Sequence, residues 1–301
     1  MSTLVTGGAG FIGSNLVEEL LAAGEDVVVL DNMHTGSPEN LKGLEGSLKL
    51  FHASCNDLSG MDLHPEMIYH LGIPSSSPMY KKNPYLVGEA INGFTSVFEL
   101  ARRSGSRVVY ASSSSLYSGL LPPHREDMTI RVSDYYTEAR LAMERMAELY
   151  RQLYNIDSVG MRFFSVYGPK ETAKQQYANM VTQFLWEMQN KKTPIIFGDG
   201  LQTRDFTFVK DVTRALQLAM KSDYHGIVNV GTGKAYTFNQ AVEVLNECMG
   251  LDIKPQYVPN PIKNYVLHTL SDTAKSEKVL GFRAGYRLED GVKELINYYA
   301  K

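Results

Sequence analysis

The sequence predicts an α/β fold in which a doubly wound parallel β-sheet is covered by helices on both faces. The first observation is a glycine-rich turn at residues 7–13, which joins an apolar strand at 3–6 to an amphipathic helix at 11–23. The second is the regular alternation of strand-like and helix-like segments up to Val230. Parallel strands joined by helices form a sheet whose ligands bind beyond the carboxyl ends of the strands.

The turn contains three glycines, Gly7, Gly10 and Gly13, in the spacing G-x-x-G-x-x-G. Because glycine lacks a β-carbon, the backbone can approach a pyrophosphate closely, and the first N–H groups of the next helix face its negative charge. Phe11 and Ile12 begin that helix. The pattern therefore predicts a diphosphate-binding turn, although a glycine triplet alone also occurs in ordinary turns.

An acidic residue closes the second strand, which is expected at residues 26–30. Asp31 follows the glycines by about the twenty residues that are typical of a dinucleotide site, where a carboxylate binds both hydroxyls of an adenosine ribose. The same carboxylate repels the 2′-phosphate of NADP, and no arginine occurs in residues 32–34. We therefore expect NAD rather than NADP, with Asn32 beside Asp31 in the cofactor site.

Length and composition are typical of a soluble globular protein with a substantial core. The chain has 301 residues, of which 44% are hydrophobic and 21% charged, and its net charge is −3. No basic run indicates nucleic acid or a membrane surface as a partner, and no apolar run reaches the length of a membrane span. Two cysteines, Cys55 and Cys248, and the absence of a signal peptide favour a cytoplasmic protein without a cysteine-rich metal site.

Apolar runs and helical spacing predict the remaining elements. A loop rich in Gly, Pro, Asn and Ser is expected at 32–46. Strands are expected at 48–51, 67–71, 107–111, 194–197 and 227–230, and helices at 84–103, 133–154, 177–190, 209–220, from 238, 273–280 and 288–300.

Several polar residues follow the ends of these strands. Asp57, with Leu58, either meets the adenine edge or caps a helix, and the sequence leaves both alternatives open. Leu71 ends the fourth strand and leads into a serine-rich loop beside the expected cofactor cleft.

A run of four serines at 112–115 follows the fifth strand, where it forms either part of a site or a plain polar turn. Tyr136 and Arg140 are four residues apart on the following helix and therefore project from one face. Such a pair alone more often serves packing and solvation than function, but the preceding run of serines favours a functional role here.

The glycine turn, Asp31, a serine at the end of the fifth strand and a tyrosine followed by a cation resemble the extended short-chain dehydrogenase/reductase superfamily. Within it, the sequence is most similar to the NAD-dependent nucleotide-sugar epimerases and dehydratases, above all to the UDP-glucose 4-epimerase group. Further motifs at 162–169, 198–206, 229–233 and 272–281 match in order.

The resemblance implies a Rossmann domain for NAD, formed by 1–168 with 205–232, and a smaller C-terminal α/β substrate-binding domain, formed by 169–204 with 233–301. It also implies a homodimer that pairs helices near 89–101 and 138–150.

By this resemblance, Ser113 binds the sugar oxygen and Tyr136 is the acid/base. Tyr135 is not chosen, because the residue four positions after it is Ala139 and not a basic residue. Arg140 stands where the family has lysine, whose charge favours the phenolate. Arginine keeps the charge but is larger and planar. The residues expected at the cofactor are Gly7, Gly10, Phe11, Ile12, Gly13, Asp31, Asn32, Asp57, Leu58, Leu71, Ser112, Tyr136, Arg140 and Phe163.

On the substrate side, Ser165 replaces an asparagine that holds the diphosphate in many epimerases. Lys174 neutralises a phosphate or serves as a second acid/base, as in the similar ADP-heptose epimerases, or is simply solvated. Arg204 is expected to clamp the diphosphate, and Lys263 to supply a phosphate contact where the family has Arg-x-Gly-Asp. The expected substrate residues are Ser76, Ser113, Ser115, Tyr136, Ser165, Lys174, Arg204 and Lys263.

The resemblance thus implies epimerisation of a nucleotide sugar at C4, with UDP-glucose and UDP-galactose preferred from the family alone. One alternative is 4,6-dehydration, which is disfavoured because Ser114 and Ser115 occupy positions that are Asp-Glu in dehydratases. Another is a different epimerase, and a third is an NAD-binding relative impaired by Arg140.

Overall fold

The centre of the protein is one parallel sheet of seven strands, with the order β11-β6-β5-β4-β1-β2-β3. The computed structural model describes residues 2–261 and 265–300. The strands of this sheet are β1 Ser2–Thr6, β2 Asp26–Asp31, β3 Leu48–His52, β4 Met67–His70, β5 Arg107–Ser113, β6 Ser158–Phe163 and β11 Gly226–Val230. The predicted doubly wound α/β fold is confirmed.

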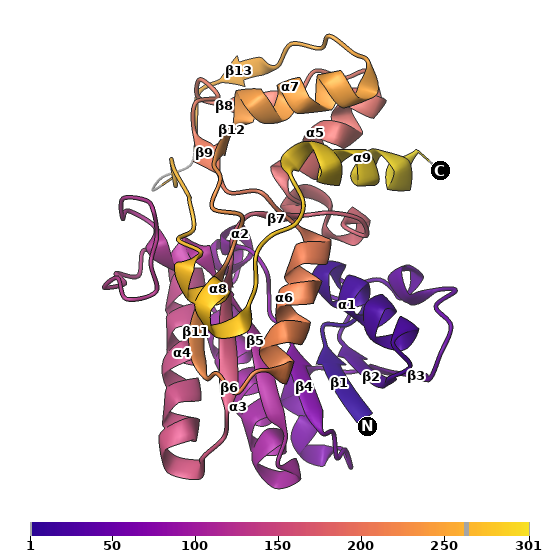
Figure 1. Cartoon of the computed structure of the whole chain (residues 1–301), viewed down its shortest axis with the longest axis vertical. Helices are drawn as coiled ribbons and strands as arrows, with labels where there is room; N and C mark the ends of the chain where they lie inside the picture. The colour runs from indigo at the N-terminus through magenta and orange to yellow at the C-terminus, as the bar shows by residue number, and fades with distance from the viewer. Residues whose placement is uncertain (1, 262–264, 301) are drawn as a thin grey trace.

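Helices cover both faces of this sheet (Figure 1). Neighbouring residues of β1 show the two layers, because side chains alternate between the faces of a strand. Val5 belongs to one hydrophobic core and Leu4 to the other. The helices of the first core are α1 Phe11–Ala22, α6 Val209–Lys221 and α8 Ala274–Leu280. Those of the second are α3 Leu86–Ser104, α4 Tyr135–Tyr154 and the short α2 Ser77–Lys82.

The chain changes direction across the sheet at β1. It first runs outward through β2 and β3, and then returns to β4 on the opposite side of β1. The connections after β1 and β4 therefore diverge and leave a crevice beyond the strand ends, which is where open α/β sheets bind ligands.

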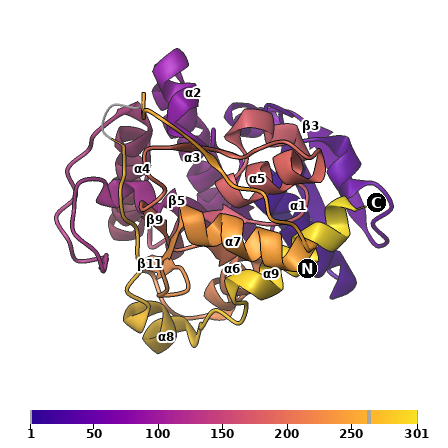
Figure 2. The same ribbon diagram turned by 90° about the horizontal axis from the view of Figure 1, so that it is seen from above.

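A smaller part of the chain lies above the carboxyl ends of the strands. Three helices, α5 Met180–Gln189, α7 Phe238–Met249 and α9 Leu288–Tyr299, share a third hydrophobic core. They lie above the sheet in Figure 1 and nearest the viewer in Figure 2. Its short strands are β7 Val166–Tyr167, β8 Ile195–Phe197, β9 Thr203–Arg204, β10 Thr207–Phe208, β12 Tyr236–Thr237 and β13 Gln256–Val258.

Helix α8 returns to the main sheet although it is late in the sequence. Leu280, its last residue, and Phe282 pack into the core formed with α1 and α6. The division into residues 1–168 with 205–232 and 169–204 with 233–301 remains a prediction.

Most predicted elements agree with the structure within a few residues. One difference matters for the site: Ser112 and Ser113 belong to β5 and not to the loop after it, because they pair with Arg162 and Phe163 of β6. The remaining short elements are the 3₁₀ turns η1 Pro38–Leu41, η2 Cys55–Gly60, η3 Ser114–Tyr117 and η4 Thr172–Tyr177. Within the described ranges, no helix is long and apolar enough to cross a membrane.

Candidate active site

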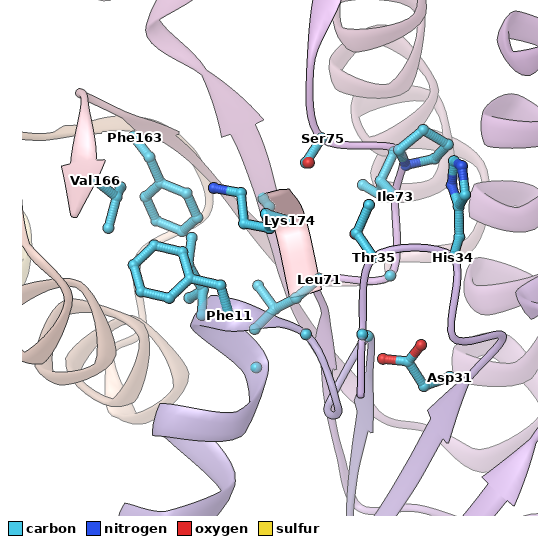
Figure 3. A pocket seen from close by; sticks show the side chains of 18 of the residues that line it. Phe11, Asp31, His34, Thr35, Leu71, Ile73, Ser75, Phe163, Val166 and Lys174 are labelled. Carbon is cyan, nitrogen blue, oxygen red and sulfur yellow. The ribbon is translucent and has the colours of Figure 1, made fainter. Parts of the chain in front are cut away.

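A cavity at the carboxyl edge of the sheet brings together residues from the ends of β1, β2, β4, β5 and β6 (Figure 3). It contains most of the residues that the sequence singled out. Those that line it are Gly7, Gly10, Phe11, Ile12, Gly13, Asp31, Asn32, Leu71, Ser112, Ser113, Tyr136, Arg140, Phe163 and Lys174.

The glycine turn forms a tight backbone cradle at one wall of this cavity. Gly7 has a φ of +69°, and a β-carbon there would lie 2.6 Å from the Cα of Gly72. A β-carbon on Gly13 would lie 2.1 Å from the carbonyl oxygen of Gly7. Gly10 precedes α1 and offers no side chain to its first N–H groups. A bare helix N-terminus at this place fits the diphosphate of a dinucleotide.

Asp31 lies beside this cradle with its carboxylate fixed by two backbone donors. Ala9 N–H donates to Oδ2 at 3.0 Å and Met33 N–H donates to Oδ1 at 2.8 Å. Burial raises the pKa of this carboxyl group, and the backbone hydrogen bonds partly oppose the effect. Each carboxylate oxygen can accept a further hydrogen bond, so the geometry fits the ribose role predicted for Asp31.

A second cavity continues from the first toward η2 and α3, with Asp31, Asn32 and Gly7 in both linings. Cys55 and Asn56 line it, whereas Asp57 and Leu58 line neither cavity. The Asp57 carboxylate instead accepts the Ser54 N–H at 3.0 Å in a capping box, which is the alternative that the sequence had left open.

Tyr136 and Arg140 lie together and both line the first cavity. The Arg140 guanidinium carbon is 4.9 Å from the centre of the Tyr136 ring. It donates to the carbonyl oxygens of Ala111 at 3.3 Å and Pro74 at 3.0 Å, so it joins the ends of β5 and β4. Its Nε is buried and has no hydrogen-bond partner in the part of the chain that the structure describes. The arginine thus brings a permanent charge to the tyrosine and keeps one donor for a ligand.

The serine turn, formed by residues 112–117, presents one hydroxyl to the cavity in a defined orientation. The Ser113 Oγ accepts the N–H of Ser115 at 3.0 Å, so its own proton is free for a ligand. The Ser112 hydroxyl donates to Glu144 at 2.6 Å instead. Ser115 and Ser76 do not line the cavity, but Ser75, the residue before Ser76, does.

Lys174 reaches the cavity from η4, after the end of β6. Its Nζ is 3.1 Å from Glu171 Oε2 and 4.9 Å from the centre of the Phe11 ring, and its side chain is 15% exposed. Figure 3 shows it pointing toward Phe11 and Phe163. Glu171 is fully buried and also accepts hydrogen bonds from Thr182 Oγ1 and Asn179 N–H. Lys174 is therefore a partly buried lysine that pairs with Glu171 at the cavity.

Two other expected substrate residues lie outside this cavity. Ser165 Oγ accepts a hydrogen bond from Asn179 Nδ2 at 3.2 Å. Arg204 donates to the carbonyl oxygens of Val266 at 2.7 Å and Leu267 at 3.2 Å, and burial lowers the pKa of its guanidinium. Lys263 lies outside the described residues.

Further lining residues escaped the sequence analysis although they adjoin predicted ones. They closely follow Asp31 or Leu71, so the rule that ligands bind at strand ends could have found them. These residues are His34, Thr35, Gly36, Gly72, Ile73 and Pro74.

Comparisons with known proteins extend this description. Residues 3–231 match the family model described as NAD dependent epimerase/dehydratase family. A UDP-glucose 4-epimerase of Mycolicibacterium smegmatis is 33% identical over 310 residues, which cover 99% of this chain and 98% of that protein. UDP-glucuronic acid decarboxylase 1 of Arabidopsis thaliana is 29% identical, over 98% of this chain and 68% of that protein.

Two solved structures share the fold over the whole chain. UDP-glucose 4-epimerase of Thermotoga maritima, solved with UDP-glucose, has a TM-score of 0.94 at 30% identity and covers 100% of this chain and 99% of its own. A UDP-glucose 4-epimerase of Thermus thermophilus, solved with NAD, has a TM-score of 0.89 at 28% identity with the same coverage. The predicted cofactor, NAD, is confirmed, whereas the reactions named for the relatives differ.

Proposed function

This chain belongs to the NAD-dependent epimerase/dehydratase family and is an enzyme of that family, and we propose that it epimerises a nucleotide sugar at C4. UDP-glucose and UDP-galactose are the preferred pair. The observation that carries the proposal is the convergence of Ser113, Tyr136 and Arg140 on one cavity that continues into the dinucleotide cradle.

The cradle, Asp31 and the Nε of Arg140 are the groups that would hold NAD. When bound, NAD supplies a reversible hydride acceptor for the sugar carbon. Tyr136 Oη, as general base, takes the proton of the sugar 4-hydroxyl and later returns it to the same oxygen, once C4 has received hydrogen on its opposite face. The free proton of Ser113 hydrogen-bonds the same sugar oxygen and fixes it near the phenol. Between the two steps the 4-keto sugar turns about its phosphate linkage, so the sugar end must be held loosely.

The test follows the conversion of UDP-galactose to UDP-glucose without added cofactor and identifies the NAD released on denaturation. General acid–base catalysis contributes about 10²- to 10⁴-fold in rate, so Tyr136→Phe should lose turnover by that factor while retaining NAD. Tyr135→Phe is the matched control, because Tyr135 is 52% exposed and should leave turnover unchanged. Undiminished epimerisation by Tyr136→Phe would rule out the assignment.

Dehydration is the weaker alternative because it needs further acid and base groups at the sugar. Among the described residues, Asp31 is the one carboxylate that lines the first cavity, and it lies by the cradle. Lys174 supplies a cation or one acid/base group to this cavity, whereas 4,6-dehydration needs both an acid and a base at the sugar. The Arg140→Lys variant distinguishes a working enzyme from an impaired relative. Turnover by the wild-type protein argues against impairment, whereas activity that appears only in the lysine variant supports it.

We further propose that Ser76, Ser115, Ser165, Arg204 and Lys263 contribute to nucleotide-sugar binding once substrate is present. For Arg204 this requires that the phosphate replaces the carbonyl groups of Val266 and Leu267.

A homodimer and a cytoplasmic location also remain proposals. The outer surface of α4 exposes Leu149, Leu153 and Tyr154, at 52%, 67% and 52%. This apolar row fits the helix pairing that the resemblance implies. Sedimentation equilibrium that shows only monomer would contradict the dimer.

A further inference from the structure

A buried ion pair lies behind the serine turn and is not used by the proposed chemistry. Arg162 of β6 binds Glu144 of α4 through two parallel hydrogen bonds, Nε to Oε1 at 2.9 Å and Nη2 to Oε2 at 2.7 Å. Both side chains are 5% exposed. The third guanidinium nitrogen, Nη1, donates to the hydroxyl of Tyr117 at 2.9 Å. Arg162 therefore joins α4 to the end of η3.

Both elements joined by Arg162 carry proposed catalytic groups. Glu144 follows Tyr136 by eight residues and Arg140 by four, so all three share one face of α4. Glu144 also accepts the hydroxyl of Ser112, the neighbour of Ser113. The pair thus ties the helix of the tyrosine to the strand end of the serine.

The other branch of the network fixes the far end of the serine turn. Tyr117 closes the turn that Ser113 opens as its cap. The Tyr117 hydroxyl donates to Asn229 Oδ1 of β11 at 2.7 Å, and its ring stacks on His124 at 4.8 Å. Every nitrogen of the Arg162 guanidinium and both carboxylate oxygens of Glu144 are hydrogen-bonded, so the network has one satisfied arrangement.

A buried ion pair adds little net stability, because the cost of removing two charges from water offsets their attraction. Its planar, two-bond geometry does specify how the joined elements are oriented. We propose that Arg162 is a positioning residue that sets the separation of the Ser113 hydroxyl and the Tyr136 phenol through Tyr117 and Glu144. This inference rests on the proposed function of those two groups.

The decisive variant replaces the pair with apolar side chains, Arg162→Met with Glu144→Leu, because such replacements commonly preserve stability. A positioning role predicts a Tm near that of wild type and a kcat lowered by about 10- to 100-fold, since misplacement by about 1 Å costs up to that factor. KM and NAD content should stay within about threefold. A double variant with wild-type Tm and wild-type kcat would overturn the proposal.

Arg162→Lys tests the planar geometry of the guanidinium, because an ammonium group keeps the charge but cannot bind Glu144 and Tyr117 at the same time. It should lower kcat by a similar factor and change the pH profile of kcat, which loss of stability alone does not move. Arg107→Lys is the matched control: Arg107 lies at the opposite end of β5 and binds the carbonyl oxygens of Ala219 and Tyr224. It should leave kcat and its pH profile unchanged.

If wild type converts no nucleotide sugar, the proposed function fails, and a second readout then tests the network by itself. Amide hydrogen exchange of residues 114–118 should be faster in Arg162→Lys than in wild type or Arg107→Lys. Equal exchange in all three proteins would overturn the positioning role. Faster exchange confined to Arg162→Lys would support it.

Discussion

The folded state should lose stability in acid through one buried histidine, His70, at the end of β4. His70 is 1% exposed, and its Nδ1 lies 2.7 Å from the hydroxyl of Thr6. The Thr6 oxygen accepts the Gly72 N–H at 3.1 Å, so its proton is available for Nδ1 and the imidazole is held neutral. Burial, together with the nearby charge of Arg140, lowers the pKa of His70 to about 3.

The direction of this pH effect follows from proton binding by His70 in the folded and unfolded states. The unfolded chain binds a proton on this imidazole near its ordinary pKa of 6.5, whereas the folded chain does so only near 3. The contribution to stability is therefore complete above pH 6.5 and is lost as the pH falls from 6.5 toward 3. With about 1.36 kcal/mol per pKa unit, the loss by about pH 5 is about 2 kcal/mol.

The assay is urea unfolding of wild type and His70→Asn at pH 8 and pH 5, with saturating NAD in every sample. Asparagine retains an acceptor toward Thr6 but does not titrate. The variant is expected to be less stable at both values because it leaves space beside Phe94, whose ring contacts His70. Wild type should nevertheless lose about 2 kcal/mol more than the variant between the two pH values. Equal losses of stability in the two proteins would show that His70 does not titrate in this way.

Three further changes test the cofactor cradle and the lysine. Asp31→Asn should weaken NAD binding by about 10- to 100-fold in calorimetric titration and reduce the preference over NADP, because a charged acceptor is lost. Gly13→Ala should abolish NAD retention, because its methyl group would lie 2.1 Å from a carbonyl oxygen. The control is Gly88→Ala, where the methyl group enters open space on α3 and should raise the free energy of unfolding by up to about 1 kcal/mol. Lys174→Gln should lower kcat/KM at least about tenfold with NAD retained, whereas the exposed Lys192→Gln should not, as initial rates would show.

Features that are encoded in contiguous segments can be predicted from the amino-acid sequence. The glycine spacing and Asp31 predict a dinucleotide site because turn, helix and strand end lie within about thirty residues of one βαβ unit. The pair Tyr136 and Arg140 is set by the helical repeat alone. Alternating strands and helices likewise determine a parallel sheet, since a crossover returns each strand in the same direction.

The pairing of side chains from distant segments depends on how the chain folds in three dimensions. Lys174 enters the cleft because Phe11 and the buried Glu171 surround it, and no local pattern distinguishes it from a solvated lysine. The run of serines by itself does not distinguish Ser112 from Ser113, but in the structure Ser112 donates its hydroxyl to Glu144 whereas Ser113 accepts the Ser115 N–H. Burial and hydrogen bonding depend on which chain segments meet in space, so they assign these roles after the sheet has formed.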